Sequence, residues 1–211
     1  MEAVVDVSQE PYHHRVLENG CVKVFRVEVP PGVETLLHHH ARDYAFVNLG
    51  ESETTNQVPG QPAVDSQARD GDVHLVKAPL THKVRNRGVT LYRNVVAEIV
   101  ATQPQKPAAA GSPACGARAA GVTSKLLFET EVVRAWETRL DPGATPPRHE
   151  HQHDYLLVAV SEVELRDDVE SQEPRTIRQK PGEVAWVEAP RTHTLTNLSC
   201  RPARFVILEF K

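Results

Sequence analysis

Long hydrophobic segments and an excess of positive charge are both missing from this 211-residue sequence. No apolar run approaches the roughly 20 residues that a membrane-spanning helix needs. The formal net charge is −4, which gives no electrostatic reason to expect nucleic acid or an anionic membrane as a partner. The first residues carry an acid where a signal peptide has a base, and no long apolar segment follows. We therefore expect a cytoplasmic protein that binds neither membranes nor nucleic acid.

Cysteine is also scarce, since the chain contains three: Cys21, Cys115 and Cys200. They form no C-x-x-C pair, and their number is odd. A chain of this length folds without disulfide bonds. We expect Cys21 and Cys200 to be partly buried thiols and Cys115 to lie in a linker, rather than any of them to be a nucleophile.

Amphipathic helical patterns are absent as well, because no window of helix length places apolar residues at i, i+3, i+4 and i+7. The apolar residues instead form short, Val-rich runs close to period two, such as CVKVFRVEV (21–29) and VVRAWETRL (132–140). Turn signals built from Gly and Pro separate these runs. Many short strands at even spacing predict an all-β sandwich or barrel.

The most informative feature present is a repeat. Residues 31–44 (PGVETLLHHHARDY) and 142–155 (PGATPPRHEHQHDY) both read G-x5-H-x-H-x2-D-Y. A second pair, GDVHLVKAPLTHKVRN (71–86) and GEVAWVEAPRTHTLTN (182–197), follows at the same offset. All matched positions are 111 residues apart, with no gap needed. The sequence predicts one module written twice.

This repeat sets the expected domain boundaries. The first domain covers residues 1–102, including a lead-in of residues 1–14, and the second covers residues 122–211. Residues 103–121 are rich in Ala, Pro and Gly, which is typical of a linker or a long surface loop.

Histidines recur at identical places in both copies. Alternate side chains of a strand share a face, so His38 and His40 point the same way, and the second copy keeps this pair as His149 and His151. Three neutral imidazoles that converge inside a barrel suit a divalent first-row metal. The expected metal ligands are His38, His40 and His82 in the first copy, and His149, His151 and His193 in the second.

Other polar residues receive simpler interpretations. His13 and His14 have no counterpart in the second copy, and we expect both on the surface. One charged pair repeats, and its simplest role is an ion pair at a strand edge: Arg93 with Glu98, repeated as Arg204 with Glu209.

The histidine motifs resemble those of the cupin superfamily, and their duplication resembles a bicupin. The family's first motif is approximately G-x5-H-x-H-x3–4-E-x6-G, and its second is approximately G-x5-P-x-G-x2-H-x3-N. The matching positions are Gly32, His38, His40, Gly71, His82 and Asn86, then Gly143, His149, His151, Gly182, His193 and Asn197. The resemblance covers both modules and implies two double-stranded β-helix (jelly-roll) barrels, each with a metal site lined by those histidines. The two asparagines are expected to hydrogen-bond within the barrel.

The chain departs from the family where a glutamate ligand should follow the second histidine. Asp43 and Asp154 stand one residue too early, and we keep three roles open for them: metal ligands, acceptors that fix a histidine tautomer, or turn residues. Tyr44 and Tyr155 come next. Each either brings a hydroxyl to the cavity or is a core aromatic.

Two functions remain open from the sequence. The first is a metal-dependent enzyme that acts on a small organic molecule, a dioxygenase type with Fe or a Lewis-acid isomerase or lyase with Mn, Ni or Zn. Its candidates for proton transfer are Asp43, Tyr44, Asp154 and Tyr155. The second is a non-catalytic small-molecule-binding or structural bicupin, because fold does not fix function. A bicupin already contains two barrels, so a monomeric pseudo-dimer and a homodimer are both expected options.

Overall fold

The computed structural model describes residues 2–101 and 119–211. The chain divides into two compact units, Met1–Ala101 and Thr102–Lys211. Nearly all regular structure in the described residues is β-strand, with one short 3-10 helix, so the predicted all-β class is confirmed. Most of the expected linker, residues 103–118, lies outside the described residues. In the described ranges, no helix is long and apolar enough to cross a membrane.

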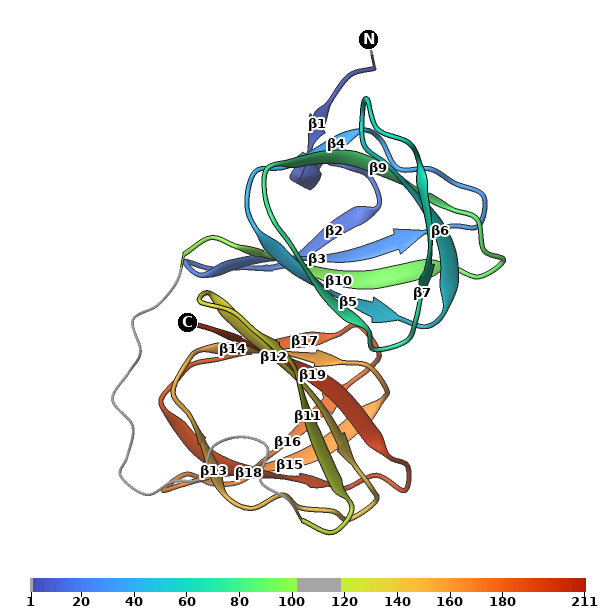
Figure 1. The fold of residues 1–211 in the computed structure, drawn as a ribbon. Helices are drawn as coiled ribbons and strands as arrows, with labels where there is room; N and C mark the ends of the chain where they lie inside the picture. The colour runs from blue at the N-terminus through green and yellow to red at the C-terminus, as the bar shows by residue number, and fades with distance from the viewer. Residues whose placement is uncertain (1, 102–118) are drawn as a thin grey trace. The chain divides into compact units, whose positions relative to one another are not determined.

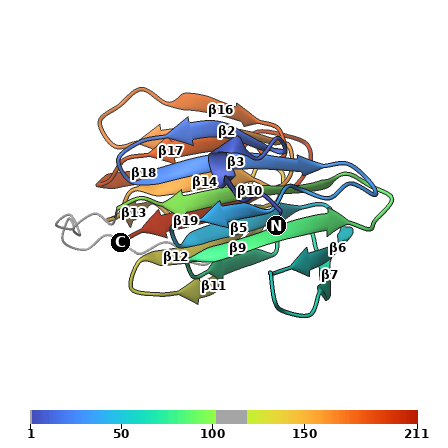
Figure 2. The same ribbon diagram turned by 90° about the horizontal axis from the view of Figure 1, so that it is seen from above.

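The first unit is a ring of strands seen along its axis in Figure 1. Its sheets have the orders β1-β4-β9-β6-β7 and β2-β3-β10-β5-β8. All pairings are antiparallel except that of β1 with β4. Figure 2 shows β3, β10 and β5 running side by side. The elements are β1 (Val5–Asp6), η1 (Val7–Gln9), β2 (His13–Glu18), β3 (Val22–Val29), β4 (His38–His40), β5 (Tyr44–Leu49), β6 (Ser52–Gln57), β7 (Val64–Ala68), β8 (Val73–Val76), β9 (Leu80–Asn86) and β10 (Tyr92–Ile99).

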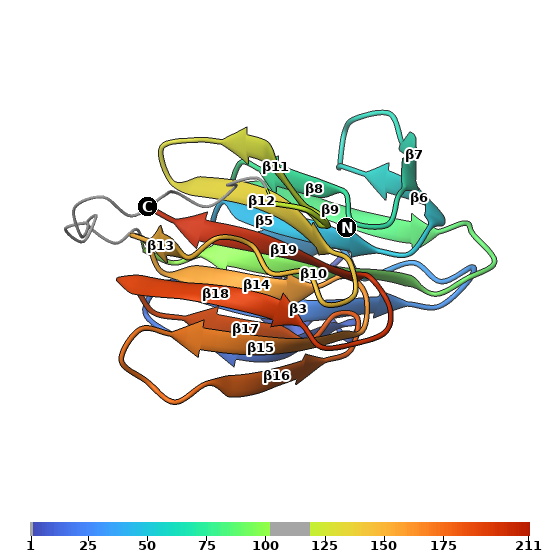
Figure 3. The ribbon, with the colours of Figure 1, turned by 90° about the horizontal axis from the view of Figure 1, so that it is seen from below.

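The second unit repeats this arrangement with sheets β11-β12-β19-β14-β17 and β13-β18-β15-β16, except that no strand among its described residues corresponds to β1. Strands β18, β15 and β16 lie side by side in Figure 3. Its strands are β11 (Val122–Glu129), β12 (Val133–Leu140), β13 (His149–His151), β14 (Tyr155–Ala159), β15 (Val163–Val169), β16 (Arg175–Gln179), β17 (Val184–Val187), β18 (Arg191–Asn197) and β19 (Ala203–Phe210).

The Val-rich runs of the sequence form the central strands because β-branched and aromatic side chains fit a pleated, half-buried surface. Phe25, Val27 and Val29 of β3 enter the core of the first barrel, at 0, 3 and 0% exposure. Each such side chain contributes roughly 1.5–3 kcal/mol on burial. The second barrel has a larger apolar cluster, which includes Leu140, Tyr155, Leu157, Leu165, Leu195, Phe205 and Ile207.

The glycines that open the repeated motifs adopt positive φ, for example +76° at Gly32 and +73° at Gly143. Glycine reaches this region without the steric cost that a Cβ imposes. Cys21 is buried, whereas Cys200 is exposed, so the expected partial burial of Cys200 is wrong. Cys115 falls outside the described residues.

Strand register explains how distant histidines meet. In the first unit, His38 of β4 lies directly opposite His82 of β9, and in the second, His149 of β13 lies opposite His193 of β18. Directly opposed residues of antiparallel strands place their Cβ atoms about 4.5–5.5 Å apart on one face. Figure 1 shows β4 and β9 as neighbours at the rim of their barrel.

Candidate metal centres

The first unit brings His38, His40 and His82 together inside the barrel. Their exposures are 1, 1 and 8%. The ring centroids lie 5.1 Å apart for His38 and His40, 4.6 Å for His38 and His82, and 5.4 Å for His40 and His82. The three imidazoles predicted from the repeat therefore face one another in one place.

The second unit gathers His149, His151 and His193 in the same way. The centroid distances are 5.0, 4.9 and 5.2 Å. One potential ligand atom from each of these three residues lies within 4.8 Å of the other two. The second triad thus has a geometry that could hold a metal ion, and in the first unit the group that meets the same distance is His13, His38 and His40, without His82.

Each of the six rings is anchored through Nδ1. In the first unit the acceptors for His38, His40 and His82 are Leu36 O at 2.8 Å, Glu98 Oε1 at 3.1 Å and Asn56 Oδ1 at 2.8 Å. In the second, those for His149, His151 and His193 are Pro147 O at 2.9 Å, Glu209 Oε1 at 2.8 Å and Asp167 Oδ1 at 2.7 Å. An anchored Nδ1–H leaves the Nε2 lone pair free for a ligand.

Four of the six Nε2 atoms are buried and lack a hydrogen-bond partner among the described residues. These are the Nε2 atoms of His38, His82, His151 and His193. An unsatisfied buried polar atom costs free energy, and native structures contain few of them. A divalent first-row metal satisfies such atoms, so the residues present fit a metal.

Burial keeps these rings in the form that binds metals. Burial lowers the pKa of His38 and of His149 to about 4, and nearby histidines add to the effect. Burial likewise lowers the pKa of His82 to about 2. A metal ligand must be unprotonated, and at neutral pH these imidazoles are neutral.

The repeated glutamates have a different role from the one expected. Glu98 and Glu209 are both 3% exposed and accept hydrogen bonds from His40 and His151. The expected strand-edge pair of Arg204 with Glu209 is wrong, since Arg204 instead binds Glu137 at 2.9 Å. Carboxylates in this position orient a ligand histidine and fix its tautomer.

Asp43 and Asp154 lie in the short connections directly before β5 and β14. Asp43 accepts a hydrogen bond from the Ala78 N–H at 2.8 Å and pairs with Lys77 at 2.7 Å. Asp154 accepts the equivalent bond from the Ala189 N–H at 2.8 Å. Of the three roles left open by the sequence, these contacts match the turn residue. Neither aspartate belongs to the described clusters of ligand atoms.

Tyr44 and Tyr155 pack against the second histidine of each triad. The Tyr44 ring stacks on His40 at 4.2 Å between centroids, and the Tyr155 ring lies 4.3 Å from that of His151. The tyrosines are 4 and 1% exposed. Burial raises the pKa of Tyr44. This phenol therefore stays protonated at neutral pH, and the packing matches the core-aromatic alternative.

The motif asparagines hold the loops that follow the last histidine strands. Asn86 Nδ2 donates to Val29 O at 2.9 Å and Thr90 O at 2.8 Å. Asn197 Nδ2 makes the corresponding bonds to Leu140 O at 3.0 Å and Arg201 O at 2.7 Å. As expected, both asparagines hydrogen-bond within their barrels.

The first unit also contains a histidine that the repeat could not reveal. His13 was expected on the surface, but its side chain is 6% exposed and its ring centroid lies 4.8 Å from that of His38. Its Nδ1 binds Glu10 Oε2 at 2.7 Å. His14, on the other face of β2, is exposed as expected. The sequence signal that could have found His13 was the period-two alternation of residues 13–18. It indicates that either His13 or His14 points inward, but not which one.

A cavity of about 340 Å³ in the first barrel adjoins the histidines. Its lining has a polar wall that includes the buried residues Thr54, Tyr92 and Asn94. The Asn94 Oδ1 atom has no hydrogen-bond partner within the described residues. Val, Leu and Phe side chains form much of the remaining lining, which includes no Lys, Arg, Asp or Glu among the described residues.

The same positions of the second barrel are apolar. The residues 111 positions after Thr54, Tyr92 and Asn94 are Leu165, Ala203 and Phe205. All three belong to the buried cluster of the second unit, at 0, 0 and 1% exposure. Close-packed side chains thus replace the polar wall of the first barrel.

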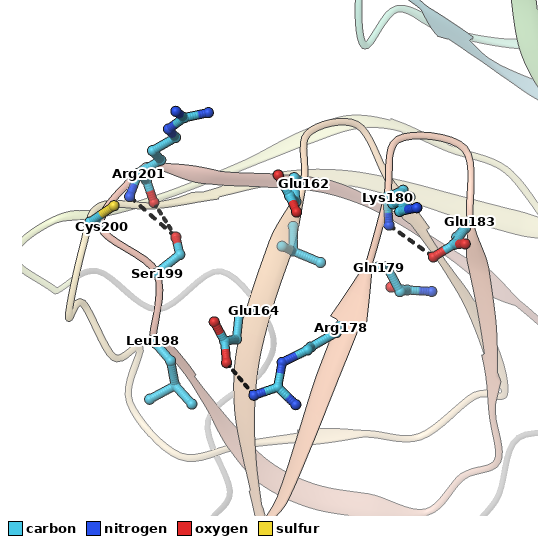
Figure 4. A pocket seen from close by; sticks show the side chains of 11 residues that line it. Glu162, Glu164, Arg178, Gln179, Lys180, Glu183, Leu198, Ser199, Cys200 and Arg201 are labelled. Atoms are coloured by element: carbon cyan, nitrogen blue, oxygen red, sulfur yellow. Dashed lines mark hydrogen bonds and ion pairs between the residues drawn. The ribbon is translucent and has the colours of Figure 1, made fainter.

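A larger groove of about 670 Å³ lies elsewhere on the second unit (Figure 4). Hairpin β15–β16 and the loop after β18 form it, and the Glu164–Arg178 ion pair crosses it at 2.5 Å. An equivalent groove of about 420 Å³ occupies the matching positions of the first unit. No histidine of either triad lines these grooves, so we regard them as a feature of the fold and not as the site.

Searches with protein-family models and against curated proteins gave no match. Similar solved structures include an oxalate decarboxylase, at 13% identity over 97% of this chain and 76% of that one, with a TM-score of 0.67. AerE from Microcystis aeruginosa is 12% identical, over 96% of this chain and 98% of that one, with a TM-score of 0.61. A cupin 2 conserved barrel domain protein from Leptotrichia buccalis is 14% identical, over 93% of this chain and 87% of that one, with a TM-score of 0.56. Identities this low show the fold alone.

Proposed function

We propose that this chain, which folds as a bicupin, is a metal-dependent enzyme whose reaction takes place in the first barrel. The observation that carries the proposal is the combination found there: buried imidazoles with unpartnered Nε2 atoms next to a cavity of about 340 Å³. The second barrel keeps the imidazoles, but apolar side chains replace the polar wall. We propose that its centre has a structural role.

In the first barrel, the Nε2 atoms of His38, His40 and His82 would hold a divalent metal. Imidazole ligands suit Fe, Ni and Zn. When bound, such a metal supplies Lewis-acid polarisation of an oxygen-bearing group or, with iron, redox chemistry. A structure of the Bacillus subtilis oxalate decarboxylase that concerns Mn(II) centres has the same fold, with a TM-score of 0.65 at 13% identity.

The cavity lining favours a small, uncharged organic substrate. Apart from the proposed metal, the described lining offers no Lys or Arg to pair with a carboxylate that is taken out of water. Thr54, Tyr92 and Asn94 suit a hydroxyl, carbonyl or amide group, and the Val and Leu walls suit an apolar portion. For this reason we do not extend oxalate, named for the structural neighbour, to this chain.

One observation favours the non-catalytic alternative, a small-molecule-binding bicupin. In the described lining of the cavity, no carboxylate is present to transfer a proton. Proton transfer would then depend on the histidines or on Tyr44 and Tyr92, which also line the cavity.

The proposal is tested by measuring whether a small anion can reach the metal at each centre. The chain is loaded with Co(II), and azide is titrated while the visible absorption spectrum is recorded. His149→Ala/His151→Ala isolates the first centre, and His38→Ala/His40→Ala isolates the second. We expect azide to change the spectrum of the first centre only. Equal responses would show that the packed second interior does not block access, and no bound Co(II) would rule out a metal enzyme.

The substrate class has its own test. Asn94→Phe gives the first barrel the residue of the second, and we expect it to abolish stabilisation by neutral small molecules in thermal unfolding. A panel of phenols, diols and amides is compared with carboxylic acids of matched size. A panel in which only the acids stabilise the wild type contradicts the uncharged-substrate proposal. The matched control is Phe205→Leu, which changes the other barrel.

A further inference from the structure

We infer that the first centre is a four-histidine site in which His13 Nε2 joins His38, His40 and His82, whereas the second centre has three histidines. The inference rests on the proposed function in one respect, that the first site holds a metal. An octahedral ion with four protein ligands keeps two positions for other molecules, and one with three keeps three. The two centres therefore differ in the chemistry open to them.

The position of His13 supports ligation. Potential ligand atoms of His13, His38 and His40 all lie within 4.8 Å of one another. The His13 ring centroid is 4.8 Å from that of His38 and 6.1 Å from that of His40. With metal–nitrogen bonds of about 2.1 Å, ligand atoms lie at most about 4.2 Å apart. The 4.8 Å limit that His13, His38 and His40 meet is close to that spacing.

Glu10 gives His13 the orientation of a metal ligand. Its carboxylate is 2% exposed and accepts the His13 Nδ1–H at 2.7 Å. The N–H groups of Tyr12 and Leu36 also donate to it, at 2.8 and 3.2 Å. A buried carboxylate fixed by backbone amides cannot turn away, so His13 presents Nε2 to the other rings. His38, His40 and His82 are anchored by Nδ1 in the same way.

The second unit lacks both members of this pair. The position equivalent to His13 is Ser124, whose hydroxyl lies 3.1 Å from that of Thr138. The backbone register is the same, since His13 pairs with Val27 and Ser124 with Thr138. Gly121 stands in place of Glu10. The second unit is therefore an internal reference with the same strand and no fourth imidazole.

The segment that carries His13 is also attached to the histidine strand. Strand β1 pairs in parallel with β4, with Val5 opposite His38. Val5 N donates to Leu37 O at 3.0 Å. A metal held by both β2 and β4 would link this segment to the barrel, so metal binding is expected to slow amide hydrogen exchange in residues 5–13.

The experiment uses the full chain with His149→Ala/His151→Ala, so that Co(II) binds at the first centre alone. X-ray absorption counts the imidazoles, and competition titration gives the Co(II) affinity. We expect four imidazoles in this reference and three after His13→Gln, with an affinity loss larger than the roughly 10–100-fold expected when only the partner of a ligand histidine is removed, as in Glu10→Gln. Glu10→Gln should also weaken binding. His14→Gln, a change on the exposed face of the same strand, should do neither.

The outcomes separate the two proposals. Three imidazoles in the reference, with an unchanged affinity after His13→Gln, overturn the fourth ligand and leave the proposed function standing. A reference that binds no Co(II) overturns both. If His13→Gln does not fold by circular dichroism, the imidazole count of the reference and the Glu10→Gln titration still decide.

Discussion

The two barrels share a backbone plan and a histidine triad, yet their surroundings differ in a consistent way. In the first, Asn56 accepts from the third histidine, and a cavity lies beside the rings. In the second, Asp167 takes that place, and the interior is packed with apolar side chains. Positions that repeat form the histidine clusters, and positions that differ between the copies decide which side chains surround each cluster.

Charge separates the barrels as well. Asp167 is 1% exposed and binds Arg175 at 3.0 Å, Arg191 and His193. Burial alone would raise the pKa of Asp167, but the bonds from His193 and Arg191 outweigh it and leave the pKa below its ordinary value. The first unit has Val64 and Leu80 where the arginines stand. We conclude that the third histidine of the second unit is fixed by a network, which suits a structural centre.

The largest expected effect is acid destabilisation of the metal-free chain. The pKa values of His38 and His149 are lowered to about 4 from 6.5 in the unfolded chain. The unfolded state therefore binds more protons below pH 6.5, and stability is lost as the pH falls from 6.5 to 4. Each such histidine contributes about 1.4 kcal/mol per pH unit at most. Urea unfolding with and without chelator measures this loss, and a flat profile across this range contradicts the lowered values.

A smaller effect is expected from Asp167→Ala, which removes the network that only the second barrel has. Removing one partner of a buried ion pair costs about 3–5 kcal/mol because the other charge is left uncompensated. Urea unfolding of the chelated protein should show this loss in the second unit. The matched control is Glu164→Gln, which breaks the exposed pair with Arg178 and should cost at most about 1 kcal/mol. Similar losses for both changes would contradict a structural network.

The smallest expected effect compares the two glutamates behind the second histidines. Glu98→Gln and Glu209→Gln should each weaken metal binding at their own centre by roughly 10–100-fold, because the amide no longer favours one histidine tautomer. The loss should be greater at the second centre if His13 supports the first. Competition titration with Zn(II), on chains in which the other triad is changed to Ala, measures both. Equal losses would remove this support for a fourth ligand.

Several features of the fold followed from pattern alone. Period two gave the strands at residues 21–29 and 132–140, and the structure has β3 and β12 there. The fixed offset of 111 residues identified six histidines that the structure brings into two clusters. The roles of Glu98 and His13 could not be predicted from the sequence. Glu98 follows an arginine on the same strand, so the sequence suggested a surface ion pair. His13 has no counterpart in the second copy, so nothing in the repeat marked it as part of a site.

The sequence by itself determined the strands, the repeated triads and the turn asparagines, because side-chain alternation and identical spacing are local properties. Only the tertiary structure decided which residues surround the triads. Glu98 reaches His40 across 58 residues, and His13 meets His38 because β2 and β4 belong to the same barrel. Whether a cavity exists depends on the volumes of side chains such as Asn94 and Phe205 once the sheets have closed. Such contacts arise from the pairing of distant strands, and no short stretch of sequence contains them.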